Sequence, residues 1–89
     1  EVKLYMMGDI IELFEIVPIG NGSHYLCKDK SGQYFKRHKG ESQTKEDLVF
    51  ISKKVAQDYI DKYLDVNKYI PEVFGYNIDY LAADIIKEV

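Results

Sequence analysis

The sequence holds one cysteine, two prolines and no tryptophan among its 89 residues. A single thiol, Cys27, cannot form an internal disulfide, which excludes the disulfide-rich scaffolds of small secreted proteins and favours a reducing compartment. No apolar run approaches the roughly 18 residues of a membrane-spanning helix, and the first residues lack the basic and then apolar pattern of a signal peptide. We therefore expect a cytoplasmic protein with no membrane segment.

The composition indicates one small globular domain. Hydrophobic residues make up 46% of the chain and aromatic residues 13%, which excludes a disordered chain. A length of 89 residues lies near the lower end of what folds without disulfides or metals. Since the chain begins at Glu1 rather than at a methionine, we interpret residues 1–89 as a single domain or as the later, C-terminal part of a longer one.

The net charge of −3 is unevenly distributed along the chain. Residues 28–45 are net positive, whereas the segments before and after them are net negative. General nucleic-acid binders usually carry a net positive charge over the whole domain. An acidic chain with one basic strip therefore favours a different class of partner.

Local patterns in the first half of the chain predict strands and turns. Residues 3–5 are expected to form a short strand. Residues 9–17 fit a helix capped by Asp9, but their Ile, Val and Phe content also suits a strand, and both interpretations stay open at this point. Residues 20–22 are expected to form a turn. Residues 23–29 and 33–39 flank a short loop that ends in Gly32, which predicts a β-hairpin.

The second half contains the clearest helix pattern. Residues 48–51 form an apolar run of strand length, and Ser52 is a good N-cap. The helix predicted over residues 53–65 places one apolar stripe on a sheet: Val55, Ala56, Tyr59, Ile60, Tyr63 and Leu64. Residues 65–76 are expected to be a connection interrupted by Pro71 and Gly75. Asn77 is expected to cap a final helix with Ile78, Leu81, Ala82, Ile85 and Val89 on one side. This order predicts an α+β fold, with a small antiparallel sheet arranged as a meander and helices packed on one side of it.

Candidate metal ligands and nucleophiles are few and do not converge. The only histidines and cysteine are His24, Cys27 and His38, whereas a zinc site uses about four such groups, or three in a catalytic site. Along a strand, His24 and Cys27 point to opposite faces. A Cys–His nucleophile would also need a third, orienting group, and none is evident. We expect no metal site and no nucleophile.

The remaining patterns do not indicate catalysis. Glu12 and Glu15 are expected to form a solvated face, and no acid lies in the apolar context that tunes a general acid. Gly20-Asn21-Gly22 lacks the spacing of a phosphate-binding loop. We therefore predict no catalytic residue, no cofactor and no enzymatic activity.

A basic strip in the hairpin region allows one alternative function. It consists of Lys28, Lys30, Lys36, Arg37 and Lys39, interleaved with Tyr25, Tyr34 and Phe35. Aromatic rings among cations on a sheet are what binders of single-stranded nucleic acid use. The opposite interpretation is that strand alternation turns the rings inward and the cations outward.

Three stretches within residues 4–66 form a combination typical of one family. The first is similar to an entry strand followed by a short helix and reads "LYMMGDIIEL". The second resembles a hairpin with Pro-Ile-Gly, Gly and Gly-x-x-Tyr signatures and reads "VPIGNGSHYLCKDKSGQYFKRHKG". The third looks like a closing strand and helix and reads "EDLVFISKKVAQDYIDKYL". In this combination the chain resembles the later part of the SMI1/KNR4 superfamily, also called SUKH. The resemblance implies that residues 9–17 form a helix. It also implies a binding function without catalysis, because many bacterial members look like immunity proteins that neutralise a toxin and others are regulatory adaptors.

We therefore expect a protein-binding domain, either an immunity protein against a toxin domain or an adaptor. An acidic surface suits a basic nuclease as the partner, because complementary charge speeds encounter and enforces specificity. The expected partner contacts are Tyr25, Tyr34, Asp58, Asp61, Tyr63, Asp65 and Tyr69, with the two hairpin tyrosines included on condition that the hairpin face is open. A core position for Tyr59 and Tyr63 is the competing interpretation, and we favour it for Tyr59. Two alternatives remain: a single-stranded nucleic-acid binding module, and a phage- or plasmid-encoded inhibitor of a DNA-processing enzyme.

Overall fold

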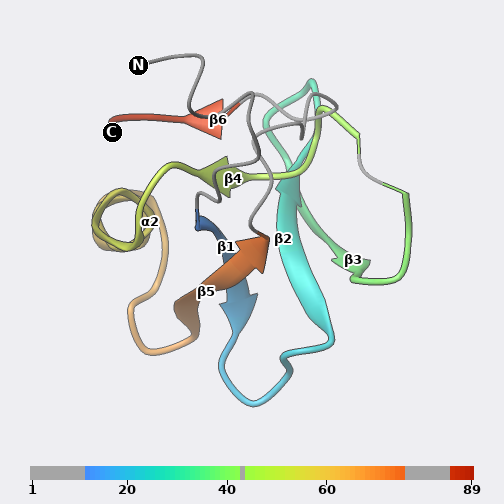
Figure 1. The fold of residues 1–89 in the computed structure, drawn as a ribbon, viewed down its shortest axis with the longest axis horizontal. Helices are drawn as coiled ribbons and strands as arrows, with labels where there is room; N and C mark the ends of the chain where they lie inside the picture. Colours follow the sequence, from blue (N-terminus) through green and yellow to red (C-terminus); the bar gives the residue numbers. More distant parts are fainter. Residues whose placement is uncertain (1–11, 43, 76–84) are drawn as a thin grey trace, which may run out of the picture.

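The computed structural model describes residues 12–42, 44–75 and 85–89. Their elements are β1 (Leu13–Pro18), β2 (His24–Lys28), β3 (Tyr34–His38), β4 (Val49–Phe50), α2 (Lys53–Tyr63), β5 (Tyr69–Gly75) and β6 (Ile85–Ile86). β5, β1, β4 and β6 form one sheet in that order, and β2 pairs with β3 in a second (Figure 1). The predicted α+β class is confirmed. The sheet is not an antiparallel meander, because its order does not follow the chain and β4 pairs with β6 in parallel.

β1 is the strand around which the four-stranded sheet is built. It pairs antiparallel with both β4 and β5, and its apolar side chains contribute to three apolar clusters. Ile16 packs in the cluster that α2 covers, together with Phe50 and Ile60, whereas Val17 packs with Tyr25 on the other side. The helix that the family resemblance implies is therefore wrong for residues 13–17. The expected strand at residues 3–5 and the cap at Asp9 lie outside the described residues.

The predicted hairpin is confirmed, with Cys27 paired to Phe35 and Lys28 paired to Tyr34. Its loop is closed by Asp29, whose Oδ1 accepts hydrogen bonds from the backbone N–H groups of Ser31 and Gln33, each at 2.9 Å. β2 is buried on both faces. Leu26 packs toward α2, while Tyr25 and Cys27 pack toward Val17, so the hairpin forms part of the core.

The helix that follows Ser52 is confirmed as α2. The Ser52 hydroxyl accepts a hydrogen bond from the Val55 N–H at 3.2 Å, which satisfies one of the free donors of the first turn. Tyr59 and Ile60 are buried against the sheet, as expected. Tyr63, at the last turn, is 53% exposed and is not part of the core.

Residues 69–75 correct the expected connection, because they form β5 and pair with β1 along their whole length. Pro71 has no N–H to donate, and it is tolerated because β5 lies at the edge of the described sheet. Ile85 and Ile86 form β6 beside β4, so the expected final helix is wrong at these positions. Its proposed cap Asn77 and the positions up to residue 84 lie outside the described residues.

The Ser52 cap generates a stability prediction. Replacing Ser52 with Ala removes the acceptor for the Val55 N–H and is expected to lower the free energy of unfolding by about 1 kcal/mol. Urea denaturation followed by circular dichroism measures this difference. Lys53→Ala, at the exposed neighbouring position, is the control and is expected to change stability little; an equal loss in both variants would contradict the role of the cap.

Candidate functional site

A buried carboxylate, Asp47, lies where the hairpin meets the sheet. Asp47 is 2% exposed and forms a β-bridge to Cys27 of β2. Beside this bridge, the Lys28 N–H donates a hydrogen bond to the Glu46 carbonyl. Two residues later the same segment becomes β4 of the four-stranded sheet. Asp47 therefore joins the two sheets through both its backbone and its side chain.

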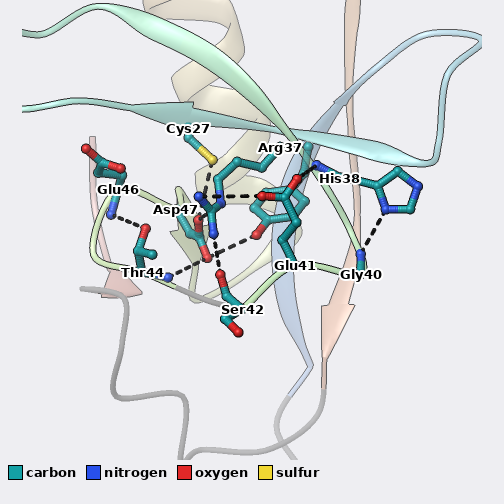
Figure 2. Close-up of polar contacts among 10 residues, drawn as sticks. Cys27, Arg37, His38, Gly40, Glu41, Ser42, Thr44, Glu46 and Asp47 are labelled. Atoms are coloured by element: carbon teal, nitrogen blue, oxygen red, sulfur yellow. Dashed lines mark hydrogen bonds and ion pairs between the residues drawn. The ribbon is translucent and has the colours of Figure 1, made fainter.

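Four groups surround the Asp47 carboxylate (Figure 2). Oδ2 accepts hydrogen bonds from the Tyr25 hydroxyl at 3.1 Å and from the Thr44 N–H at 3.2 Å. Oδ1 accepts from the Cys27 thiol at 3.4 Å and lies 3.3 Å from Nε of Arg37. Among the described residues, Nε of Arg37 has no hydrogen-bond acceptor, so its contact with Asp47 is an ion pair rather than a hydrogen bond.

Arg37 is held in place from its outer side as well. Its Nη2 donates to the carbonyl of Ser42, and its Nη1 lies 4.0 Å from Oε1 of Glu41 (Figure 2). The guanidinium thus bridges the buried Asp47 and the loop that follows β3. A buried charge needs a partner of opposite sign, and Arg37 supplies it here.

The electrostatics of this cluster exclude a reactive thiolate. Burial raises the pKa of the Cys27 thiol, and the nearby Asp47 charge raises it further. Burial likewise raises the pKa of Tyr25 to about 12. Since both groups stay protonated at neutral pH, both can donate to Asp47, and Cys27 is not activated as a nucleophile.

The two histidines lie apart from the thiol. His24 and His38 face each other across the hairpin with ring centroids 5.2 Å apart, while Cys27 points to the opposite face of β2 and toward Asp47. His38 Nδ1 accepts from the Gly40 N–H at 3.1 Å. Within residues 12–42, 44–75 and 85–89, no group of three or more His, Cys, Asp or Glu side chains is arranged to hold a metal ion.

A second buried carboxylate corrects the expectation of a solvated face at Glu15. Glu15 is 1% exposed, and its Oε2 lies 2.7 Å from Nζ of Lys39, which also donates to Oε1 of Glu72. Burial raises the pKa of Glu15 to about 7, although the hydrogen bond from Lys39 acts in the opposite direction. Sequence reasoning missed this group because it did not assign residues 9–17 to a strand. In a strand, Glu15 lies on the same face as Leu13 and Val17.

The basic strip is less available than its sequence indicates. Arg37 pairs with Asp47, and Lys39 pairs with Glu15 and Glu72. The expected outward direction of the cations therefore does not hold for Arg37, whose side chain is only 17% exposed. Lys36 is exposed, in agreement with that expectation, and Lys28 lies over the ring of Tyr34 at 5.6 Å from its centroid.

The four tyrosines expected to contact a partner differ in exposure. Tyr25 is buried at Asp47, so the condition of an open hairpin face is not met and its side chain is not available in this conformation. Tyr34 is half-buried, and its hydroxyl lies 2.8 Å from that of Tyr59. Tyr69 is half-buried against the cluster under α2. Tyr63 is the most exposed of the four, and the centroid of its ring lies 4.8 Å from that of Tyr59.

The three expected acidic contacts have local hydrogen-bond partners. Lys54 donates to Asp58 at 2.8 Å, and Gln57 donates to Asp61 at 3.0 Å, both along α2. Asp65 accepts from the Asn67 N–H at 2.9 Å and so shapes the turn after the helix. These acids stabilise their own segment, and their role in partner binding stays a prediction.

Four exposed apolar side chains lie on the turn after β1 and on the stretch from the last turn of α2 to β5, and sequence reasoning missed three of them. We call this group the apolar end; its members are 48–55% exposed and are Ile19, Tyr63, Val66 and Ile70. The N–H of Ile19 donates to the carbonyl of Lys68 at 2.9 Å, which ties the turn after β1 to the α2–β5 connection. Both segments lie in the lower part of the view in Figure 1.

Comparison with protein-family models, with curated proteins and with solved structures finds no match. The resemblance to the SMI1/KNR4 superfamily therefore stays a prediction. Among the described residues, no helix combines the length and the apolar character that crossing a bilayer requires.

The Asp47 cluster generates a prediction on stability. Asp47→Asn removes the charge that balances Arg37 and is expected to lower the free energy of unfolding by about 3 kcal/mol, because the guanidinium stays largely buried without its partner. Asp58→Asn is the matched control, because it breaks an ion pair on the exposed face of α2, where such pairs contribute little. Urea denaturation of both variants measures the difference, and a similar small effect in both would contradict the central role of Asp47.

The Cys27 environment generates a prediction on reactivity. A thiol reagent at pH ~8 is expected to label the folded chain at least ~100-fold more slowly than the urea-unfolded chain, because the buried thiol is both protonated and covered. Mass spectrometry of timed samples measures the two rates. Rapid labelling of the folded chain would show that Cys27 is accessible and that its bond to Asp47 does not persist.

Proposed function

We propose that this chain is a non-enzymatic protein-binding domain that contacts its partner through the apolar end. The observation that carries the proposal is the exposure of four apolar side chains, each about half exposed, on the turn after β1 and on the stretch from the last turn of α2 to β5, which a backbone hydrogen bond joins. Single exposed apolar residues are ordinary, but a group of them at one place is typical of interaction surfaces.

The backbone beneath the apolar end is well supported. Ile70 lies within β5 and is paired with Val17 of β1, and Tyr63 lies in the last turn of α2. Surfaces that are ordered before binding lose less conformational entropy when the complex forms. Tyr63 offers a large ring with a polar hydroxyl, a combination enriched among the residues that dominate binding energy.

For the partner, we propose a toxin domain that this chain neutralises by covering its active site, with an adaptor role as the second possibility within the same class. The resemblance to the SMI1/KNR4 superfamily and the net charge of −3 support this choice, since an acidic chain suits a basic nuclease. Asp61 and Asp65 lie two residues before and two residues after Tyr63 in the sequence and add negative charge to this part of the chain.

The nucleic-acid alternative has less support than the sequence alone indicates. Two of the five cations of the basic strip, Arg37 and Lys39, are engaged by acidic groups of the protein itself. Their positive charge is balanced internally, which leaves fewer free cations to displace the counterions of a phosphate backbone.

The experiment that tests the proposal uses the product of the reading frame next to this gene as the binding probe. Val66→Asp and Ile19→Asp place a charge in the apolar end and are each expected to weaken binding at least ~10-fold in isothermal titration calorimetry, because the charge loses hydration in the interface. Circular dichroism of both variants verifies the fold.

Val89→Asp is the matched control, because Val89 is also an exposed valine, 42% accessible, but follows β6 rather than the apolar end. It is expected to bind like the unchanged chain. Equal affinity of all three variants would contradict the apolar end as the contact surface. Absence of binding by the unchanged chain would contradict the choice of toxin as partner.

A further inference from the structure

Glu15, Glu72 and Lys39 form a cluster with an unequal number of charges. Glu15 and Glu72 are directly opposite each other in the antiparallel pair of β1 and β5, so both side chains project from the same face of the sheet. One ammonium, that of Lys39, contacts both carboxylates. With both acids ionised the cluster carries one uncompensated negative charge.

The location of that charge is unfavourable. The Glu15 side chain is 2% exposed, and its Oε1 is buried without a hydrogen-bond partner among the described residues. A buried carboxylate oxygen without a donor is costly when ionised. A proton on this carboxyl group would remove the excess charge.

Lys39 connects this cluster to the hairpin. It follows directly after β3, and its N–H donates to the carbonyl of Ser23, immediately before β2, at 3.0 Å. Its ammonium reaches across to β1 and β5 of the other sheet. The cluster therefore ties the open end of the hairpin to the four-stranded sheet, whereas Asp47 ties the hairpin at Cys27.

We propose that Glu15 and Glu72 form a proton-binding site that takes up one proton as the pH falls through neutrality, and that this proton sets how firmly the open end of the hairpin is held on the sheet. The protonated cluster is neutral and stays buried. Once the proton leaves, the uncompensated charge in this buried site favours entry of water between β1 and the open end of the hairpin.

Burial has the largest effect on the pKa of Glu15, and the charged groups around this residue act in two directions. Glu72 from β5 and Asp47 from the segment before β4 disfavour its ionised form, and Lys39 opposes them. Burial, the largest effect, adds to the two acids and brings the pKa of Glu15 to about 7. Burial lowers the pKa of Lys39, but its hydrogen bonds to Glu15 and Glu72 outweigh this and raise it, so the ammonium stays charged.

The sign of the effect on stability follows from linkage. The folded state binds the Glu15 proton more tightly than the unfolded state does, because the pKa rises from its ordinary 4.5 to about 7. The stabilisation by this proton is complete below pH 4.5 and is lost as the pH rises through about 7. The chain is thus expected to resist urea better at mildly acidic pH than at mildly alkaline pH.

The test is a carbon-13 NMR titration of the glutamate carboxyl groups in the full chain, recorded together with the backbone amide signals. Glu15 is expected to titrate near neutrality, and the amide signals of Ser23 and Lys39 are expected to shift with the same midpoint. Glu12, three residues earlier and exposed, provides the position for a matched control variant.

Glu15→Gln keeps the shape of the side chain and removes the proton equilibrium. In this variant the amide signals of Ser23 and Lys39 are expected to show no transition near neutral pH. The urea concentration at half-unfolding is expected to be the same at mildly acidic and mildly alkaline pH. Glu12→Gln, the control, is expected to retain both. Titration of Glu15 near its ordinary pKa of 4.5, or amide signals that do not follow Glu15, would overturn the proposal, and both measurements are independent of partner binding.

Discussion

The attachment of the hairpin to the sheet depends on the buried carboxylate of Asp47. The carboxylate accepts hydrogen bonds from Tyr25, Cys27 and the backbone of Thr44, and it balances the charge of Arg37. Without the carboxylate, each of these groups would be buried away from water with no hydrogen bond or ion pair to replace its hydration. Hydrophobic packing alone would allow the hairpin several positions on the sheet, whereas this set of directional contacts is satisfied in one.

The two buried acids act on the same hairpin but differ in how well they are satisfied. Asp47 has partners on both oxygens, which makes it a fixed contact. Glu15 has a partner on one oxygen only and shares it with Glu72. A satisfied network makes a fold specific, and an incompletely satisfied one is sensitive to conditions. The polar groups of the hairpin thus serve its own attachment to the sheet, and our proposal assigns partner binding to the apolar end instead.

Some of the fold was predictable because its causes are local. The hairpin follows from a loop ending in Gly32, which has φ of +89°, and α2 follows from the Ser52 cap and the spacing of Tyr59 and Ile60. β1 and β5 were not predictable in the same way. The apolar residues of β1 fit helix and strand periods equally, and Pro71 indicates a break unless the edge position of β5 is known.

The sequence by itself determined the class of the fold, the hairpin, the capped helix and the lack of an internal disulfide, since each depends on residues close together in the chain or on a simple count. Tertiary structure alone decided which charges are buried. Asp47 meets Tyr25 across 22 residues, and Lys39 meets Glu72 across 33. Nothing in the local pattern around these residues distinguishes them from solvated charges, because burial and pairing arise only when the hairpin and the sheet come together.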